Sequence, residues 1–113
     1  MKIMVLPGDG IGPEIMDATL KVVNALDAKY GIGFDLQTRA IGLPAIASKG
    51  ASLPDDVIGE CETAAGNILV PVDTVVFPPN TEGGINLSGS MRKRLALYPH
   101  IRPNKTYDGL PAQ

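Results

Sequence analysis

The order of elements predicted for the first forty residues constrains the fold more than any other feature. Residues 3–6 form a short apolar run that ends at a Pro-Gly pair, as a buried strand does. After a glycine-rich loop, Pro13 and Glu14 mark the start of a helix, and apolar residues recur at helical spacing until a glycine at 31 or 33. Residues 34–40 then alternate between apolar and polar, which predicts a half-exposed strand. Strand, helix and strand in this order predict a parallel βαβ unit.

The rest of the chain continues the same alternation. The predicted elements are a short helix at 44–48, a helix opened by Pro54-Asp55-Asp56, a strand at 67–72, a long loop at 73–86, a helix from Asn86 to about Leu97 and an extended segment at 98–107. This alternation is typical of α/β folds. A chain of 113 residues has room for one modest core, and no linker divides it. We therefore expect residues 1–113 to form a single α/β domain.

The charge and the single cysteine exclude several classes of protein. Ten basic and twelve acidic residues leave a net charge of −2, which argues against a general nucleic-acid binder. The N-terminal apolar run is too short for a signal peptide or a membrane span, so we expect a cytoplasmic protein that contacts no membrane. Cys61 is the single cysteine, so the chain cannot form an internal disulfide, and no Cys/His cluster is present that could bind zinc. The helical context of Cys61 indicates a small apolar side chain in the core.

Two loops are candidate binding regions. The glycines at 8–12 let the backbone approach a ligand at a helix start, but their spacing is neither that of a dinucleotide fingerprint nor that of a P-loop. A tight turn and a binding site remain equally open there, and Asp9 is either a ligand group or an acceptor for loop amides. The second loop, 73–86, carries hydrogen-bonding side chains and a Gly-Gly pair, so it is either a lid over a polar substrate or an irregular surface segment.

A basic stretch near the C-terminus is the third candidate. Ser88 and Arg92 are four residues apart and share a helix face, and Arg102 follows on a segment that can fold back beside that helix. Two guanidinium groups that converge in this way form a clamp for carboxylates or phosphate, although a basic block is also compatible with solvated surface. Lys93 and Arg94 lie elsewhere on the helix and are expected to be solvated. His100 has no evident partner, which favours a structural or surface role.

Two motifs in these regions resemble those of the β-decarboxylating 2-hydroxyacid dehydrogenases, which include isocitrate, isopropylmalate and tartrate dehydrogenases. The first is Pro-Gly-Asp-Gly-Ile-Gly-Pro-Glu at 7–14, and the second is Arg-Lys-x-Leu-x-Leu-Tyr-x-x-x-Arg-Pro at 92–103. The resemblance covers essentially the whole chain. It implies the βαβ-containing N-terminal portion of the isocitrate/isopropylmalate dehydrogenase fold, which is not a true Rossmann fold.

The resemblance also implies an activity and its site. Members of the family oxidise a malate-type 2-hydroxyacid with NAD or NADP and then lose a carboxylate with the help of Mg²⁺ or Mn²⁺. Arg92 and Arg102 would bind carboxylates of the substrate. The cofactor side would include Ile11 beside the nicotinamide and the turn that holds Val72 and Thr74, with Thr74 the best candidate for a direct hydrogen bond.

The start of the clamp helix bears on the choice of substrate. Family members that act on isopropylmalate place apolar residues there, whereas this chain offers Asn86 and Ser88, which an isopropyl group would leave unpaired. A polar substituent is therefore expected, as in tartrate, malate or an isocitrate-like di- or tricarboxylate. Two positions depart from the family pattern: Val70 stands where glycine is usual, and His100 where asparagine is usual.

Members of the family are much longer than this chain. Their catalytic lysine and tyrosine, their metal-binding aspartates and most of the adenosine site have no counterpart here, so we expect no catalytic residue and no metal ligand in these 113 residues. We expect a fragment or a truncated form, inactive if the chain ends at Gln113. The alternatives are a non-catalytic module that binds carboxylates or self-associates as a homo-oligomer such as a dimer, and a phosphate-binding module that uses the glycine loop.

Overall fold

A computed structural model describes residues 1–99 and 101–103 of the chain. Its centre is a parallel sheet of β1 (Lys2–Leu6), β2 (Asp35–Thr38) and β3 (Gly66–Leu69) in the order β2-β1-β3. Ile3 of β1 lies opposite Leu36 of β2 and opposite Gly66 of β3. The helix α1 (Gly12–Tyr30) joins β1 to β2. The predicted parallel βαβ unit is therefore confirmed.

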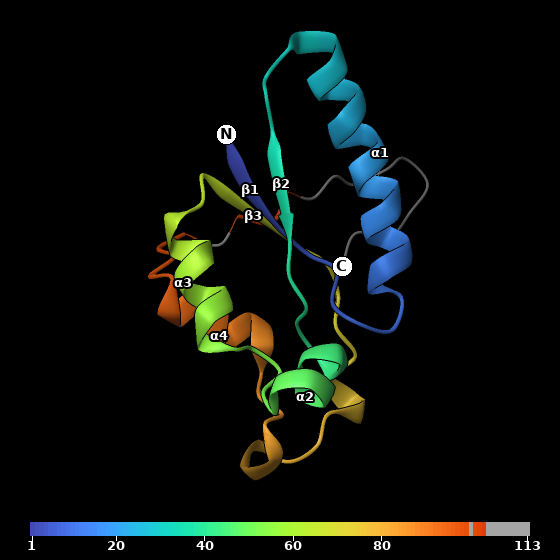
Figure 1. Ribbon diagram of the computed structural model, residues 1–113. Helices are drawn as coiled ribbons and strands as arrows, with labels where there is room; N and C mark the ends of the chain where they lie inside the picture. Colours follow the sequence, from blue (N-terminus) through green and yellow to red (C-terminus); the bar gives the residue numbers. More distant parts are fainter. Residues whose placement is uncertain (100, 104–113) are drawn as a thin grey trace, which may run out of the picture.

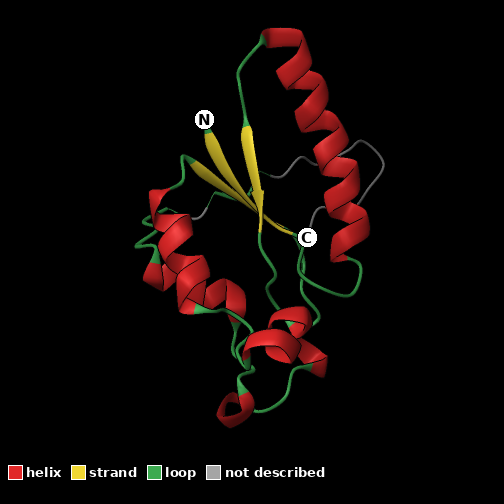
Figure 2. Ribbon diagram, viewed as in Figure 1, coloured by secondary structure: helices red, strands yellow, loops and turns green. Residues whose placement is uncertain are grey.

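The sheet lies between two helical layers, as Figures 1 and 2 show. Met4 and Leu6 of β1 point to one face and pack with α3 (Asp55–Thr63) and α4 (Leu87–Arg94), while Val5 points to the other face and packs with Met16 of α1. This alternation of side chains along a strand allows a central strand to contribute to two cores. The larger core lies on the α3 and α4 side and consists of Met4, Leu6, Ile41, Leu53, Val57, Ile58, Cys61, Leu87 and Met91.

Local signals explain where α1 begins and ends. Pro13 occupies its first turn, as predicted, because the missing N–H of proline costs nothing there. At the other end Gly31 adopts φ +62°, and its N–H donates to the carbonyl of Asp27. The carboxylate of Asp27 also accepts a hydrogen bond of 2.6 Å from the N–H of Gly33 and so closes the turn into β2. Cys61 of α3 is buried, as expected of a small core side chain, and burial raises the pKa of its thiol.

Three predicted elements are shorter than expected, and the first is β2, which covers Asp35–Thr38 instead of 34–40. The third strand ends at Leu69 instead of 72, since Pro71 has no N–H for a sheet ladder. The helix α4 ends at Arg94 instead of Leu97, because Ala96 adopts φ +49°, a left-handed conformation that a helix cannot continue through. The described part of the extended segment predicted at 98–107 contains no strand, and its remainder, with His100, lies outside the described residues.

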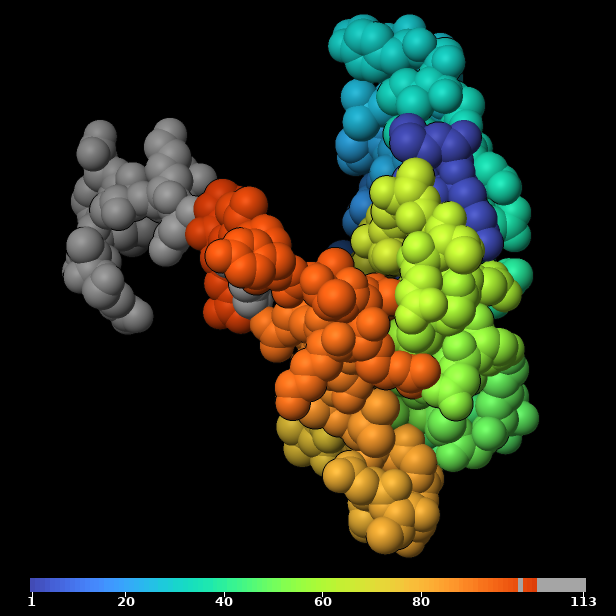
Figure 3. Space-filling view, turned by 90° about the vertical axis from the view of Figure 1, so that its left-hand side faces the viewer, coloured from blue at the N-terminus to red at the C-terminus, as the bar shows by residue number. Residues whose placement is uncertain are grey.

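The long loop contains more regular structure than predicted. Two 3₁₀ turns, η1 (Thr74–Val76) and η2 (Asn80–Glu82), lie within residues 73–86. Figure 3 shows this loop, in gold, as a projection at the lower end of the molecule. Elsewhere in the chain, the short helix α2 (Leu43–Lys49) precedes α3, as predicted. None of the helices in the described part of the chain has the length and apolar character needed to cross a bilayer.

Candidate functional site

The glycine loop packs against the turn that follows β3. A Cβ at Gly8 would lie 2.8 Å from the carbonyl oxygen of Pro71 and 2.8 Å from Cγ1 of Val72. A Cβ at Gly12 would lie 2.2 Å from the carbonyl oxygen of Pro7 and 2.7 Å from that of Pro71. Apart from the contact with Val72, these contacts are with backbone oxygens, so both positions require glycine for packing within the protein. Of the two interpretations of the loop, tight packing therefore accounts for Gly8 and Gly12.

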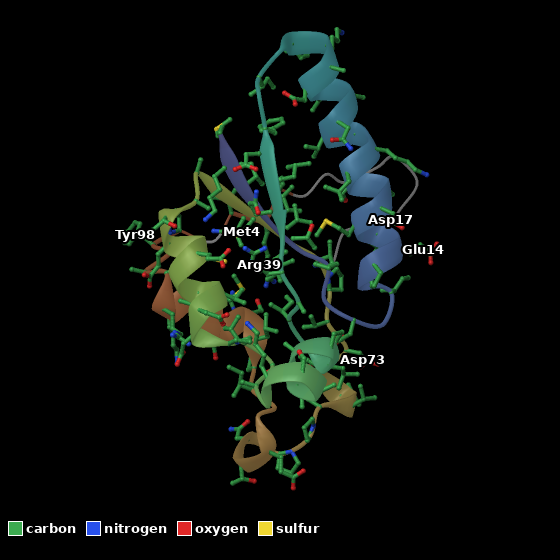
Figure 4. All side chains as sticks on the ribbon, in the orientation of Figure 1. Met4, Glu14, Asp17, Arg39, Asp73 and Tyr98 are labelled. Carbon is green, nitrogen blue, oxygen red and sulfur yellow. The ribbon has the colours of Figure 1, made fainter. Side chains whose placement is uncertain are left out.

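Asp9 holds this arrangement together. Its side chain is buried, with one carboxylate oxygen accepting a hydrogen bond of 2.8 Å from the N–H of Leu43 and the other a hydrogen bond of 2.6 Å from the N–H of Asp73. Figure 4 shows Asp73 beside α2. A buried charge requires such donors, because an unsatisfied carboxylate in the interior costs several kcal/mol. Asp9 thus satisfies amides of two distant loops, which was one of its two predicted roles.

Four of the predicted site residues line one hollow. Its volume is about 490 Å³, and it lies where the end of β3 meets the start of α4. The lining residues are Leu69, Val70, Pro71, Val72, Thr74, Asn86 and Ser88. Ligands of open α/β sheets commonly bind at the carboxyl ends of the strands, which is where this hollow lies. The side-chain oxygen of Asn86 accepts a hydrogen bond of 3.0 Å from the N–H of Gly89, so Asn86 caps α4 as predicted.

Two further hollows adjoin the first. One, of about 420 Å³, lies between β3 and α4, shares Leu69 and Ser88 with the first, and is also lined by Arg92. The other, of about 270 Å³, shares Thr74 and Asn86 and extends along the loop toward η2. We call the residues that line these three hollows the trough. Ser88 and Arg92 therefore face the same space, as their four-residue spacing predicts.

The other predicted site residues lie around the trough. Ile11, at the start of α1, is 60% exposed, and a Cβ at its neighbour Gly10 would lie 3.4 Å from Cβ of Asp73, so the two loops are adjacent. Arg102 is exposed on the segment after α4, which Figure 3 shows extending away from the main body. The clamp between Arg92 and Arg102 stays a prediction.

The charged residues of α4 differ from one another. Arg94 is exposed, as expected, and pairs with the exposed Asp55 of α3 at 2.7 Å. A pair of this kind contributes little stability, on the order of 0–1 kcal/mol. Lys93 is exposed. Within the residues that the structure describes, no group of three or more His, Cys, Asp or Glu side chains is arranged to hold a metal ion.

Comparison with known proteins decides the family. The sequence profile of the isocitrate/isopropylmalate dehydrogenase family matches residues 2–113. The chain belongs to this family. It is 36% identical to the 3-isopropylmalate dehydrogenase of Vibrio cholerae over 114 aligned positions. This alignment covers 98% of the chain and 31% of the Vibrio protein. It is 40% identical to the 3-isopropylmalate dehydrogenase of Streptococcus pneumoniae, over 96% of the chain and 32% of that protein.

Solved structures of the family share the fold. A β-decarboxylating dehydrogenase from Thermococcus kodakarensis superposes on the chain with a TM-score of 0.70 at 25% identity. The superposition covers 86% of this chain and 27% of the Thermococcus protein. The isocitrate dehydrogenase of Methylococcus capsulatus gives a TM-score of 0.69 at 31% identity. That superposition covers 86% of this chain and 26% of the Methylococcus protein. The chain spans about a third of the length of the curated relatives it matches. The expected family and its N-terminal α/β fold are confirmed.

Val70 is one of the two positions at which the sequence predicts a departure from the family pattern. The structure places its side chain in the smaller core, where it packs with Val5 and Met16. Its Cγ2 would lie 3.2 Å from a Cβ at Gly12, so a glycine at position 12 leaves room for the larger residue at position 70. Val70 also lines the first hollow of the trough, and its side chain makes that lining more apolar than a glycine would.

Proposed function

We propose that the protein carrying this chain is a β-decarboxylating dehydrogenase that oxidises a malate-type 2-hydroxyacid, and that this chain contributes part of its substrate and nicotinamide sites. The observation that supports this most is the trough, because residues from two segments that are separate in the sequence meet there. Val72 and Thr74 come from the turn after β3, Asn86 and Ser88 from the start of α4, and Arg92 from one turn further along that helix.

Each residue has a role that suits its chemistry. Arg92 offers a guanidinium group for a charge-assisted hydrogen bond to a substrate carboxylate, and Arg102 is proposed to complete the clamp. Thr74 offers a hydroxyl between the proposed substrate and cofactor positions, and Val72 and Ile11 offer apolar surface to a nicotinamide ring. When bound, NAD or NADP accepts the hydride, and Mg²⁺ or Mn²⁺ assists the loss of the carboxylate. Among the described residues no group of three or more His, Cys, Asp or Glu side chains is arranged to hold that ion.

Activity can be measured on the protein isolated from its natural source at its full length. We expect formation of NADH or NADPH from tartrate, malate or isocitrate when Mg²⁺ or Mn²⁺ is present, and loss of activity on chelation. Arg92→Ala should lower kcat/KM by roughly 10- to 150-fold, the effect of losing a hydrogen bond to a charged group. Lys93→Ala, the same change of charge on the next residue, should leave it nearly unchanged. No reduced cofactor from any 2-hydroxyacid would refute the proposed activity.

We further propose that the substrate carries a polar substituent. Asn86 and Ser88 line the trough at the start of α4, and an isopropyl group there would bury polar atoms without partners. The curated relatives named above are 3-isopropylmalate dehydrogenases, so the two substrate classes can be compared directly. Ser88→Leu should shift the ratio of kcat/KM toward 3-isopropylmalate by about 10- to 200-fold. Ser48→Leu on α2, a residue that lines none of the three hollows, is the control. An unchanged ratio in Ser88→Leu argues against a polar substituent.

A second candidate function follows from the exposed apolar surface. Val22, Tyr30 and Ile32 are between 42% and 63% exposed along and after α1, and β3 lies at an edge of the described sheet. Surfaces of this kind favour association, so a non-catalytic module that binds carboxylates and forms a homo-oligomer, such as a dimer in the cytoplasm, is the alternative. Light scattering of the isolated protein measures its oligomeric state. Carboxylate binding without cofactor reduction would favour this alternative.

A further inference from the structure

Two polar side chains are buried among the described residues, and both bind the same loop. Asp9 is 6% exposed and Ser52 is fully buried. Each forms hydrogen bonds to one end of residues 73–85, the segment that carries Thr74 into the trough. A buried polar group is costly unless its hydrogen bonds are made, so both residues are effective anchors for that loop.

Asp9 anchors the first end of the loop. Its carboxylate accepts the N–H of Asp73, the residue directly before Thr74. The second oxygen accepts the N–H of Leu43 at the start of α2. The close approach of the Asp9 carboxylate to the start of α2 depends on Gly42. A Cβ at Gly42 would lie 2.2 Å from this carboxylate, and Gly42 adopts φ +70°. The position of Thr74 is therefore tied to the glycine loop and to α2.

Ser52 anchors the other end. Its hydroxyl oxygen accepts a hydrogen bond of 3.2 Å from the N–H of Ile85, the residue directly before Asn86. Its own N–H donates to the carbonyl of Gly83 at 2.9 Å, and its carbonyl accepts the N–H of Gly42 at 2.8 Å. The segment that precedes α2 therefore connects the two anchors. Between them residues 73–76 and 79–82 are exposed, with Val75 92% exposed, whereas Gly84 is buried and Gly83 packs on the backbone of Gly50.

We propose that Asp9 and Ser52 are positioning residues that set the separation of Thr74 and Asn86 across the trough. Each anchored N–H belongs to the residue next to one of these two, and Thr74 and Asn86 both line two of the three hollows. Neither anchor lines any of the three hollows, so each acts on them through the backbone of the loop. The effect on substrate rests on the proposed function, whereas the anchoring of the loop does not.

Amide hydrogen exchange, resolved by residue, tests the anchoring without any ligand. Asp9→Asn should speed exchange at Asp73 on the order of tenfold, and Ser52→Ala should do the same at Ile85. Amides of the sheet, such as that of Arg39, which donates to Val5, should keep their rates. Unchanged exchange at Asp73 and Ile85 would overturn the proposal whether or not the protein is a dehydrogenase.

Kinetics of the full-length protein test the effect on the site. Asp9→Asn and Ser52→Ala should each raise KM for the 2-hydroxyacid roughly tenfold, because a loosened loop lowers the fraction of competent sites. Asp27→Asn is a matched control, since its carboxylate also accepts two backbone N–H groups, those of Gly33 and Phe34, but at the opposite end of the sheet. An equal rise of KM in Asp27→Asn would show general loss of stability and overturn the positioning role.

Discussion

Replacing Gly12 with alanine tests how closely the glycine loop packs on the turn after β3. The new methyl group would lie 2.2 Å from the carbonyl oxygen of Pro7 and 2.7 Å from that of Pro71. Both partners are backbone atoms, so neither can turn aside as a flexible side chain does. The carbonyl of Pro7 must retreat by roughly 0.8 Å to reach a tolerable contact, in a region where packing is dense. The turn that carries Thr74 would be displaced with it.

The expected cost follows from two opposing effects. Overpacking of this kind destabilises a fold by about 1–3 kcal/mol, whereas alanine is favoured over glycine in a helix by up to about 1 kcal/mol. We therefore expect Gly12→Ala to lower the free energy of unfolding by about 1–2 kcal/mol, which corresponds to a fall in Tm of roughly 4–16 °C for a domain of this size.

Gly59 provides the matched control. It also lies in a helix, α3, but a Cβ there would meet nothing within 4 Å. Gly59→Ala should therefore raise the free energy of unfolding by about 0.5–1 kcal/mol through helix propensity alone. Thermal and urea unfolding of the purified protein, followed by circular dichroism, measure both variants. If Gly12→Ala is as stable as the parent, or if the two substitutions change stability in the same direction, the close packing inferred for the loop is wrong.

The remaining predictions concern two titrating groups. A hydrogen bond from Lys49 holds the pKa of Asp56 below its ordinary value of 3.8, so its contribution to stability is present above that value and is lost as the pH falls through the lowered pKa. Lys49→Gln should return the pKa of Asp56 toward 3.8 in an NMR titration, and an unchanged titration would show that the pair does not form in solution. Burial raises the pKa of Cys61 above 9.0, so the thiol contributes stability below pH 9.0 that is lost as the pH rises through the higher value. Urea unfolding at about pH 8 and about pH 10 should show a smaller loss of stability in Cys61→Ala than in the parent, and equal losses would contradict the burial argument.

The strands and helices that were predicted well are those with local signals. The strand at 3–6, the helix that follows it and the parallel strand after that helix depend on periodicity, on Pro13 and on Gly31, all of which act over a few residues. The family resemblance likewise rests on two short motifs, and the comparisons confirm it. The ends of elements were less predictable, because the left-handed conformation of Ala96 has no signal in its side chain.

The candidate site depended on the tertiary structure. The sequence identified Val72, Thr74, Asn86 and Ser88 one at a time, but only the folded chain brings them around one hollow. Ser52 carried no signal at all, since its role comes from complete burial against Ile85, thirty-three positions away. Asp9 was compatible with two roles, and the choice was made by amides thirty-four and sixty-four positions away. Burial and hydrogen-bond partners depend on which distant segments meet, and the spacing of residues along a chain does not specify that.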